Sequence, residues 1–230
     1  MRQNISLFQA KFLVYLVALY FALLYASYVT AYKMVQIGPI LETAAIFLFP
    51  ISFSIADIIA EIYGYSISRQ LIWSSVLGGF LFCASIEGVI SLKSPDFWHY
   101  QAAYDIVLGH TAKIYFAMVT GMVLGSFVNV RLILRWKVLL KGRYFWLRSI
   151  GSSVVGEFLL SIIAGAISFI GVEPADKIFW LMFNGFVFKL CYATLASFPS
   201  ALVVRFLKRH EPVAVLDEEK LNPFVLKDKE

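Results

Sequence analysis

The sequence predicts an all-α, polytopic integral membrane protein with six transmembrane helices and both termini in the cytoplasm. Of its 230 residues, 60% are hydrophobic and only 15% are charged, and the mean hydropathy is +0.77. A soluble domain is about half apolar and about a quarter charged, so one soluble core could not bury this much apolar surface. Charged residues divide the chain into six apolar stretches, each close to the roughly 20 residues that cross a bilayer.

The first two apolar stretches lie near the N-terminus. Residues 12–32 carry no charge and are too long for a cleavable signal peptide, so we expect a retained span. Residues 38–63 form the second predicted span, which contains Pro50. Because proline removes a backbone donor, Pro50 indicates either an unwound stretch that lines a cavity or a simple kink.

The other four predicted spans follow at short intervals. They lie between Arg69 and Lys93, at residues 113–136, at residues 149–172 and at residues 178–204. Small residues recur at helical spacing in two of the six spans, at Gly121 and Gly125 and at Ala18, Ala22 and Ala26. Such pairs allow helices to approach closely, and we expect packing within the chain rather than between copies.

The longest connection outside the predicted spans, residues 92–112, is amphipathic. It contains Phe97, Trp98, Tyr100 and Tyr104, and such aromatic residues are enriched at membrane–water interfaces. We therefore expect this segment to lie along the membrane surface.

The distribution of basic residues predicts the orientation. Fifteen of the 20 Lys and Arg residues fall on the side of the two termini, four fall on the opposite side, and Lys189 lies within a span. Because Lys and Arg are enriched in cytoplasmic loops, both termini are expected in the cytoplasm. The predicted organisation is a single membrane domain, residues 1–207, followed by a cytoplasmic tail, residues 208–230.

Several function classes are disfavoured by missing motifs. The sequence contains no HExxH, Walker or GxSxG motif, and Cys83 and Cys191 lie in apolar runs without metal-ligand spacing. We expect no catalytic residue, metal or cofactor. The net charge of +5 is explained by the basic residues that set the orientation in the membrane, so no nucleic-acid partner is expected.

Ionisable and amide side chains inside the spans are the candidate functional residues. An ionisable residue in the bilayer core costs at least about 2.5 kcal/mol, so it has a partner or a function. These residues are Asp57, Glu61, Asn129, Glu157 and Lys189. Their positions predict that they converge on a cavity between the midplane and the cytoplasmic face.

Structural interpretations of the same residues stay open. Asp57 and Glu61 are four residues apart and share one helix face, but Glu61 lies near the interface and is expected to be solvated. Lys189 and Glu157 are alternatively a structural ion pair. Asn129 alternatively forms only a hydrogen bond between helices.

The second predicted span carries a specific combination of residues. Phe49 and Pro50 are followed by Asp57 and then by the run Glu-Ile-Tyr-Gly at residues 61–64. This combination resembles the signature of the queuosine precursor transporters, also called the vitamin uptake transporter family. The resemblance extends over about residues 47–199, with further agreement at Gln101, Gly125, Asn129, Arg148, Ser152, Ser153, Gly156, Lys189 and Pro199.

The resemblance implies a six-span carrier in the inner (plasma) membrane that imports a 7-deazaguanine base, such as preQ0, preQ1 or queuine, for tRNA modification. Phe53 would stack on the flat base, and Asp57 would accept hydrogen bonds from its guanine-like edge. Glu157 or Asn129 would bind another edge. The expected partners are therefore the deazapurine and the lipid bilayer.

The chain also departs from the family pattern. Ser126 stands where many members carry Glu or Gln, and Leu160 stands where Asp is common. The alternatives are a substrate-binding subunit of an energy-coupling-factor vitamin importer, with ATPase partner subunits, and a carrier of another nucleobase-like or vitamin-like compound. The energy source, the exact substrate and homodimer formation stay open.

Overall fold

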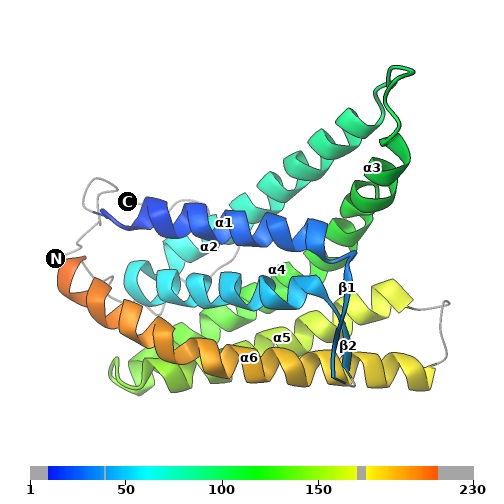
Figure 1. Cartoon of the computed structure of the whole chain (residues 1–230). Helices are drawn as coiled ribbons and strands as arrows, with labels where there is room; N and C mark the ends of the chain where they lie inside the picture. Colours follow the sequence, from blue (N-terminus) through cyan, green and yellow to red (C-terminus); the bar gives the residue numbers. More distant parts are fainter. Residues whose placement is uncertain (1–9, 39, 170–174, 212–230) are drawn as a thin grey trace.

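The computed structural model describes the backbone of residues 10–38, 40–169 and 175–211, and the side chains of these residues except 40–41, 164–169, 175–182 and 184. Long helices dominate the described chain (Figure 1). They are α1 (Leu13–Thr30), α2 (Phe49–Ile90), α3 (Gln101–Leu108), α4 (Thr111–Leu139), α5 (Phe145–Phe169) and α6 (Ala175–His210).

Helix α2 is interrupted at Gly64, which has φ +79° and ψ −171°. Glycine adopts this positive φ without the clash that a Cβ atom would cause. The parts of α2 before and after Gly64 run in opposite directions (Figure 1). The second and third predicted spans therefore correspond to two parts of one continuous helical segment.

Five stretches of the described chain are long and apolar enough to cross a membrane. They are Leu13–Thr30, Ala44–Ile90, Gln101–Leu139, Phe145–Ile163 and Gly185–His210. The stretch Ala44–Ile90 contains the reversal at Gly64. The prediction of a helical, polytopic membrane protein is confirmed, whereas the count of six spans and the cytoplasmic termini stay predictions.

The start of the second predicted span is not helical. The strands β1 (Met34–Ile37) and β2 (Ile40–Thr43) pair as an antiparallel hairpin, which is followed by a short 3-10 helix, η2 (Ala44–Phe47). Pro50 lies in the first turn of α2 and neither unwinds nor kinks a span. The first helical turn tolerates proline because its backbone N–H groups have no partner in the helix.

Helices α4 and α5 approach closely at a pair of glycines. A Cβ atom added to Gly125 would lie 2.6 Å from the carbonyl oxygen of Gly156, and one added to Gly121 would lie 3.1 Å from that of Leu160. The prediction that Gly121 and Gly125 pack within the chain is confirmed. By contrast, Ala18, Ala22 and Ala26 are exposed on α1.

The beginning of α1 and the end of α6 lie together. The backbone N–H of Phe12 donates a hydrogen bond to Glu211 Oε1 at 2.8 Å, and the rings of Phe12 and Phe206 are in edge contact. The turn at Gly64 and the α4–α5 connection lie at the same end of the bundle (Figure 1). We call this end the Gly64 end and the opposite end, which carries β1 and β2, the hairpin end.

Helix α3 lies within the connection that was expected at the membrane surface, and none of its residues is buried.

Candidate functional site

Asp57 lies at the centre of a buried hydrogen-bonded cluster. Its Oδ1 accepts from Asn129 Nδ2 of α4 at 2.6 Å, and its Oδ2 accepts from the hydroxyls of Ser149 and Ser153 of α5, the latter at 3.4 Å. Asp57 is fully buried. The donors are all neutral, and no ion pair to Asp57 is found among the described residues. A carboxylate offers about four acceptor positions, so Oδ1 retains one for a further donor.

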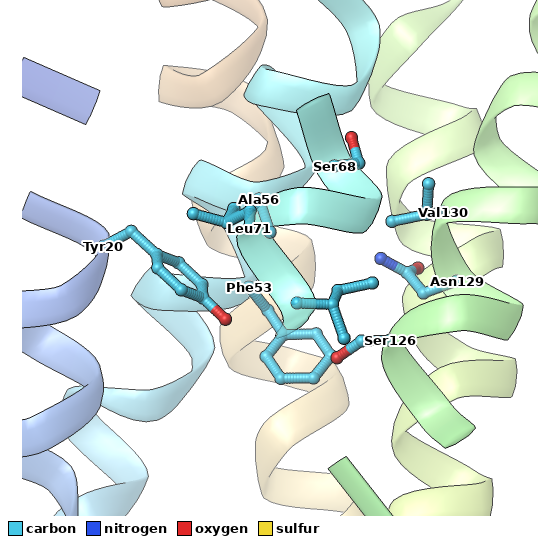
Figure 2. A pocket seen from close by; sticks show the side chains of 9 residues that line it. Tyr20, Phe53, Ala56, Ser68, Leu71, Ser126, Asn129 and Val130 are labelled. Atoms are coloured by element: carbon cyan, nitrogen blue, oxygen red, sulfur yellow. The ribbon is translucent and has the colours of Figure 1, made fainter. Parts of the chain in front are cut away.

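Asn129 connects this cluster to a small pocket. The pocket lies between α1, both parts of α2, and α4 (Figure 2). It is lined by Tyr20, Phe53, Ala56, Ser68, Leu71, Ile72, Ser126, Asn129 and Val130. Asn129 Oδ1 is buried and has no hydrogen-bond partner in the structure. Asn129 therefore lines the pocket and carries an acceptor without a partner, whereas Asp57, to which it donates, is not among the residues that line the pocket.

Phe53 supplies an aromatic surface to this pocket. It lies one helical turn before Asp57 on α2, is buried, and packs against Phe49. Ser126 of α4 lines the same pocket (Figure 2). In this conformation the pocket has room for about one water molecule, whereas ligand pockets enclose several hundred cubic ångströms. A purine-sized ligand therefore requires side chains or helices to move apart.

Glu61 is part of a separate, strongly charged cluster at the Gly64 end. Its carboxylate pairs with Arg148 of α5 at 2.8 Å and with Lys208 of α6 at 2.6 Å. Lys137 of α4 donates to the Glu61 carbonyl oxygen at 2.6 Å. The expectation that Glu61 is solvated is wrong, because its side chain and that of Arg148 are completely buried. Burial without these partners would leave an uncompensated charge.

Glu157 and Lys189 form a third group, toward the hairpin end. Lys189 Nζ lies 3.7 Å from Glu157 Oε2, and Glu157 is 5% exposed. This distance fits the expected ion pair but exceeds a hydrogen bond. Neither residue forms a hydrogen bond with Asp57, whose partners among the described residues are Asn129, Ser149 and Ser153.

The predicted site residues thus divide into three layers rather than one cluster. Asp57 and Asn129 are in direct contact with each other, and Asn129 and Phe53 line one pocket. Glu61 lies one turn farther along α2, in its own cluster, and Glu157 with Lys189 lies one turn along α5 from Ser153 in the direction of the hairpin end.

Sequence reasoning missed several partners in these layers. Arg148 and Lys208 are among the 15 basic residues expected on the cytoplasmic side, and the structure shows that both bind the carboxylate of Glu61. Ser149 was not singled out, although it binds Asp57. One signal was available, because Ser149, Ser153 and Glu157 recur every four residues and therefore form one polar stripe on α5.

The two departures from the family pattern have clear locations. Ser126 lines the pocket, where its short side chain leaves the space that a longer Glu or Gln would fill. Leu160 is buried and packs against Gly121 and Gly125 of α4, so the polar stripe of α5 does not include it.

Comparison with known proteins assigns this arrangement to a family. A family model described as "Putative vitamin uptake transporter" matches residues 43–204. The chain belongs to this family. The matched region includes the three polar layers apart from Lys208, and the resemblance inferred from residues 49–64 is confirmed. Family membership makes the chain a multi-pass membrane transporter.

A curated relative is described as "Probable queuosine precursor transporter" of Bacillus subtilis (strain 168). It is 20% identical over 174 residues, which cover 75% of this chain and 76% of the relative. No solved structure matches the chain significantly.

Proposed function

We propose that the chain imports a queuosine precursor, a 7-deazaguanine base such as preQ0, preQ1 or queuine, into the cytoplasm. The observation that carries this proposal is the buried, unpartnered acceptor Asn129 Oδ1 close to Asp57 Oδ1, which accepts one hydrogen bond from Asn129 and can accept a second. A guanine-like edge presents a ring N–H and an amino group side by side. Two adjacent acceptors complement these donors, and unsatisfied acceptors favour such a ligand over one that lacks the donors.

The flat ring system of the base is expected to stack on Phe53. An aromatic ring favours a stacked or edge-on neighbour, and Phe53 lies on the same face of α2 as Asp57. Binding then combines stacking with charge-assisted hydrogen bonds, which are about twice as strong as neutral ones. The name of the Bacillus subtilis relative supports the same substrate class.

The proposed topology has six spans, with α2 supplying two of them, and both termini in the cytoplasm. The reversal at Gly64 and the proximity of Phe12 to Glu211 support an even number of crossings. The excess of Lys and Arg at the Gly64 end supports its cytoplasmic location. The inner (plasma) membrane is the proposed compartment.

A rescue assay tests the function. Cells that neither synthesise the precursor nor carry their own importer receive this chain alone and nanomolar preQ0 or preQ1, and queuosine is then measured in their tRNA. The proposal expects queuosine to be restored. Its absence, with the protein shown to be in the membrane, would contradict the proposal.

A second candidate is a substrate-binding subunit of an importer driven by an ATPase. The exposed stripe of Ala18, Ala22 and Ala26 on α1 favours this candidate, because small residues allow another helix to approach closely. Purification from native membranes distinguishes the two. A stoichiometric membrane subunit and ATPase would favour the second candidate, whereas rescue by this chain in a host without such partners would exclude it.

A further inference from the structure

Two carboxylates face one lysine toward the hairpin end. Glu157 of α5 lies 3.7 Å from Lys189 Nζ. Glu42 of β2 lies against the bare backbone of Gly185, where an added Cβ atom would be 3.0 Å from Glu42 Oε1. Gly185 is one helical turn before Lys189 on α6, so Glu42 and Glu157 approach the same lysine from two different elements.

Each carboxylate keeps one buried oxygen without a hydrogen bond. These atoms are Glu42 Oε1 and Glu157 Oε2. The lysine does not satisfy Glu157 Oε2, since 3.7 Å is too long for a hydrogen bond. Glu157 is 5% exposed, so bulk water does not readily replace the missing donor. Unsatisfied buried acceptors are unfavourable, and a ligand that supplies donors relieves this cost.

The charge of this group points to a cationic ligand. Two carboxylates and one ammonium carry a net charge of −1, which one further positive charge would neutralise. A proton could supply this charge, but it would add only one O–H donor, and two carboxylate oxygens lack partners. A primary ammonium has three N–H donors and can bind both oxygens together.

The position of the group relates it to Asp57. Ser153 binds Asp57, and Glu157 follows Ser153 by four residues on α5. The two positions are therefore on one helix face and about 6 Å apart along the axis. A fused two-ring base whose donor edge is at Asp57 would direct its opposite end toward Glu157.

We propose that Glu42 and Glu157 bind a primary ammonium group at the far end of the substrate, so that the protein prefers a 7-aminomethyl-deazaguanine to its 7-cyano analogue. The aminomethyl group is positively charged at neutral pH, and the cyano group is neutral and donates no hydrogen bond. Lys189 holds the two carboxylates in the empty state and shifts when the ammonium binds. This inference rests on the proposed function.

Equilibrium binding to the purified full-length protein in detergent tests the inference. The aminomethyl and cyano bases are titrated separately against the wild type, Glu157→Gln and Glu42→Gln. The expected result is tighter wild-type binding of the aminomethyl base, weakened about tenfold in each variant because a charge-assisted hydrogen bond is lost. Affinity for the cyano base is expected to stay within about twofold, which also shows that the variants are folded. Glu87→Gln, at an exposed carboxylate of α2, is the matched control.

The double variant Glu157→Gln/Lys189→Met separates ligand binding from structural pairing. If Glu157 served only to neutralise Lys189, removing both charges would restore binding of the aminomethyl base, and the inference would be wrong. Persistent weakening supports the inference. Equal loss of both bases in the single variants would also overturn it. Failure of the wild type to bind either base would instead contradict the proposed function.

Discussion

Asp57 is the residue on which the proposed binding site depends most directly. Its carboxylate is buried, is bound by three neutral donors, and retains an acceptor position next to Asn129 Oδ1. Neutral donors hold the carboxylate in place without neutralising its charge. That charge is therefore available to a ligand donor, unlike the charge of Glu61, which two cations already neutralise.

Replacing Asp57 by Asn is expected to weaken substrate binding by about 10- to 100-fold, because the variant loses a charge-assisted hydrogen bond. Titration of the purified protein with the deazaguanine base measures the change. Asp96→Asn, at an exposed aspartate between α2 and α3, is the control and should bind as the wild type does. Unchanged affinity in Asp57→Asn would refute the assignment of Asp57 to the site.

Replacing Glu61 by Ala is expected to destabilise the protein by about 3–5 kcal/mol, because Arg148 is left buried without its counter-ion. Glu87→Ala, at an exposed position, should change stability by less than about 0.5 kcal/mol. Reversible unfolding in detergent provides the comparison. The double variant Glu61→Ala/Arg148→Ala should lose less than the sum of the two single variants. Additive losses would show that the two charges do not interact.

At the scale of helices, the approach of α4 and α5 determines where Asn129 meets Asp57. The pair Gly125 and Gly156 lets the two backbones touch, and an added Cβ atom on Gly156 would lie 3.0 Å from Asn129 Cβ. The glycines thus bring Asn129 to the level of Ser149 and Ser153. Larger residues would separate the helices that carry the donors to Asp57.

Gly125→Ala is accordingly expected to cost about 1–3 kcal/mol, because its Cβ atom would lie 2.6 Å from a backbone oxygen that has little freedom to move. Gly88→Ala is the matched control. Gly88 is also helical but has no atom within 4 Å of an added Cβ, so alanine should stabilise the helix by up to about 1 kcal/mol. Equal effects in the two variants, measured by unfolding in detergent, would contradict close packing at Gly125.

At the scale of the whole molecule, the two parts of α2 decide the topology. If each part crosses the membrane, residues 34–43 and the connection after α2 lie on one side, and the turn at Gly64 lies on the other. If α2 crossed only once, the hairpin and the connection after α2 would lie on opposite sides. The Glu61 cluster lies at the Gly64 end, so the topology also decides which side of the membrane this cluster is near.

Cysteine labelling tests this topology in a background without Cys83 and Cys191. A membrane-impermeant maleimide added to intact cells should label Gln36→Cys and Ser94→Cys. Ser66→Cys and Arg143→Cys, both exposed, should react only after permeabilisation. Labelling of Gln36→Cys and Ser94→Cys from opposite sides would instead indicate a single crossing by α2.

The sequence by itself determined the membrane-embedded helical class, the family, and the polar residues of α2. These properties follow from composition and from residues close together in the chain, such as Asp57 and Glu61 four positions apart. The spacing of Gly121 and Gly125 likewise predicted close helix packing correctly. Strand β2 was hidden because its residues lie within the apolar stretch 38–63, which was assigned to a span.

Only the tertiary structure decided which charges meet. Glu61 is paired with residues 87 and 147 positions away, and Asp57 with Asn129 at a separation of 72. No local pattern encodes such partners, because they depend on the order and tilt of packed helices. Helix packing therefore pairs Glu61 with Arg148 and Lys208 and surrounds Asp57 with neutral donors. The same packing placed Glu42 and Glu157 around Lys189, where charge and unsatisfied oxygens favour a cation.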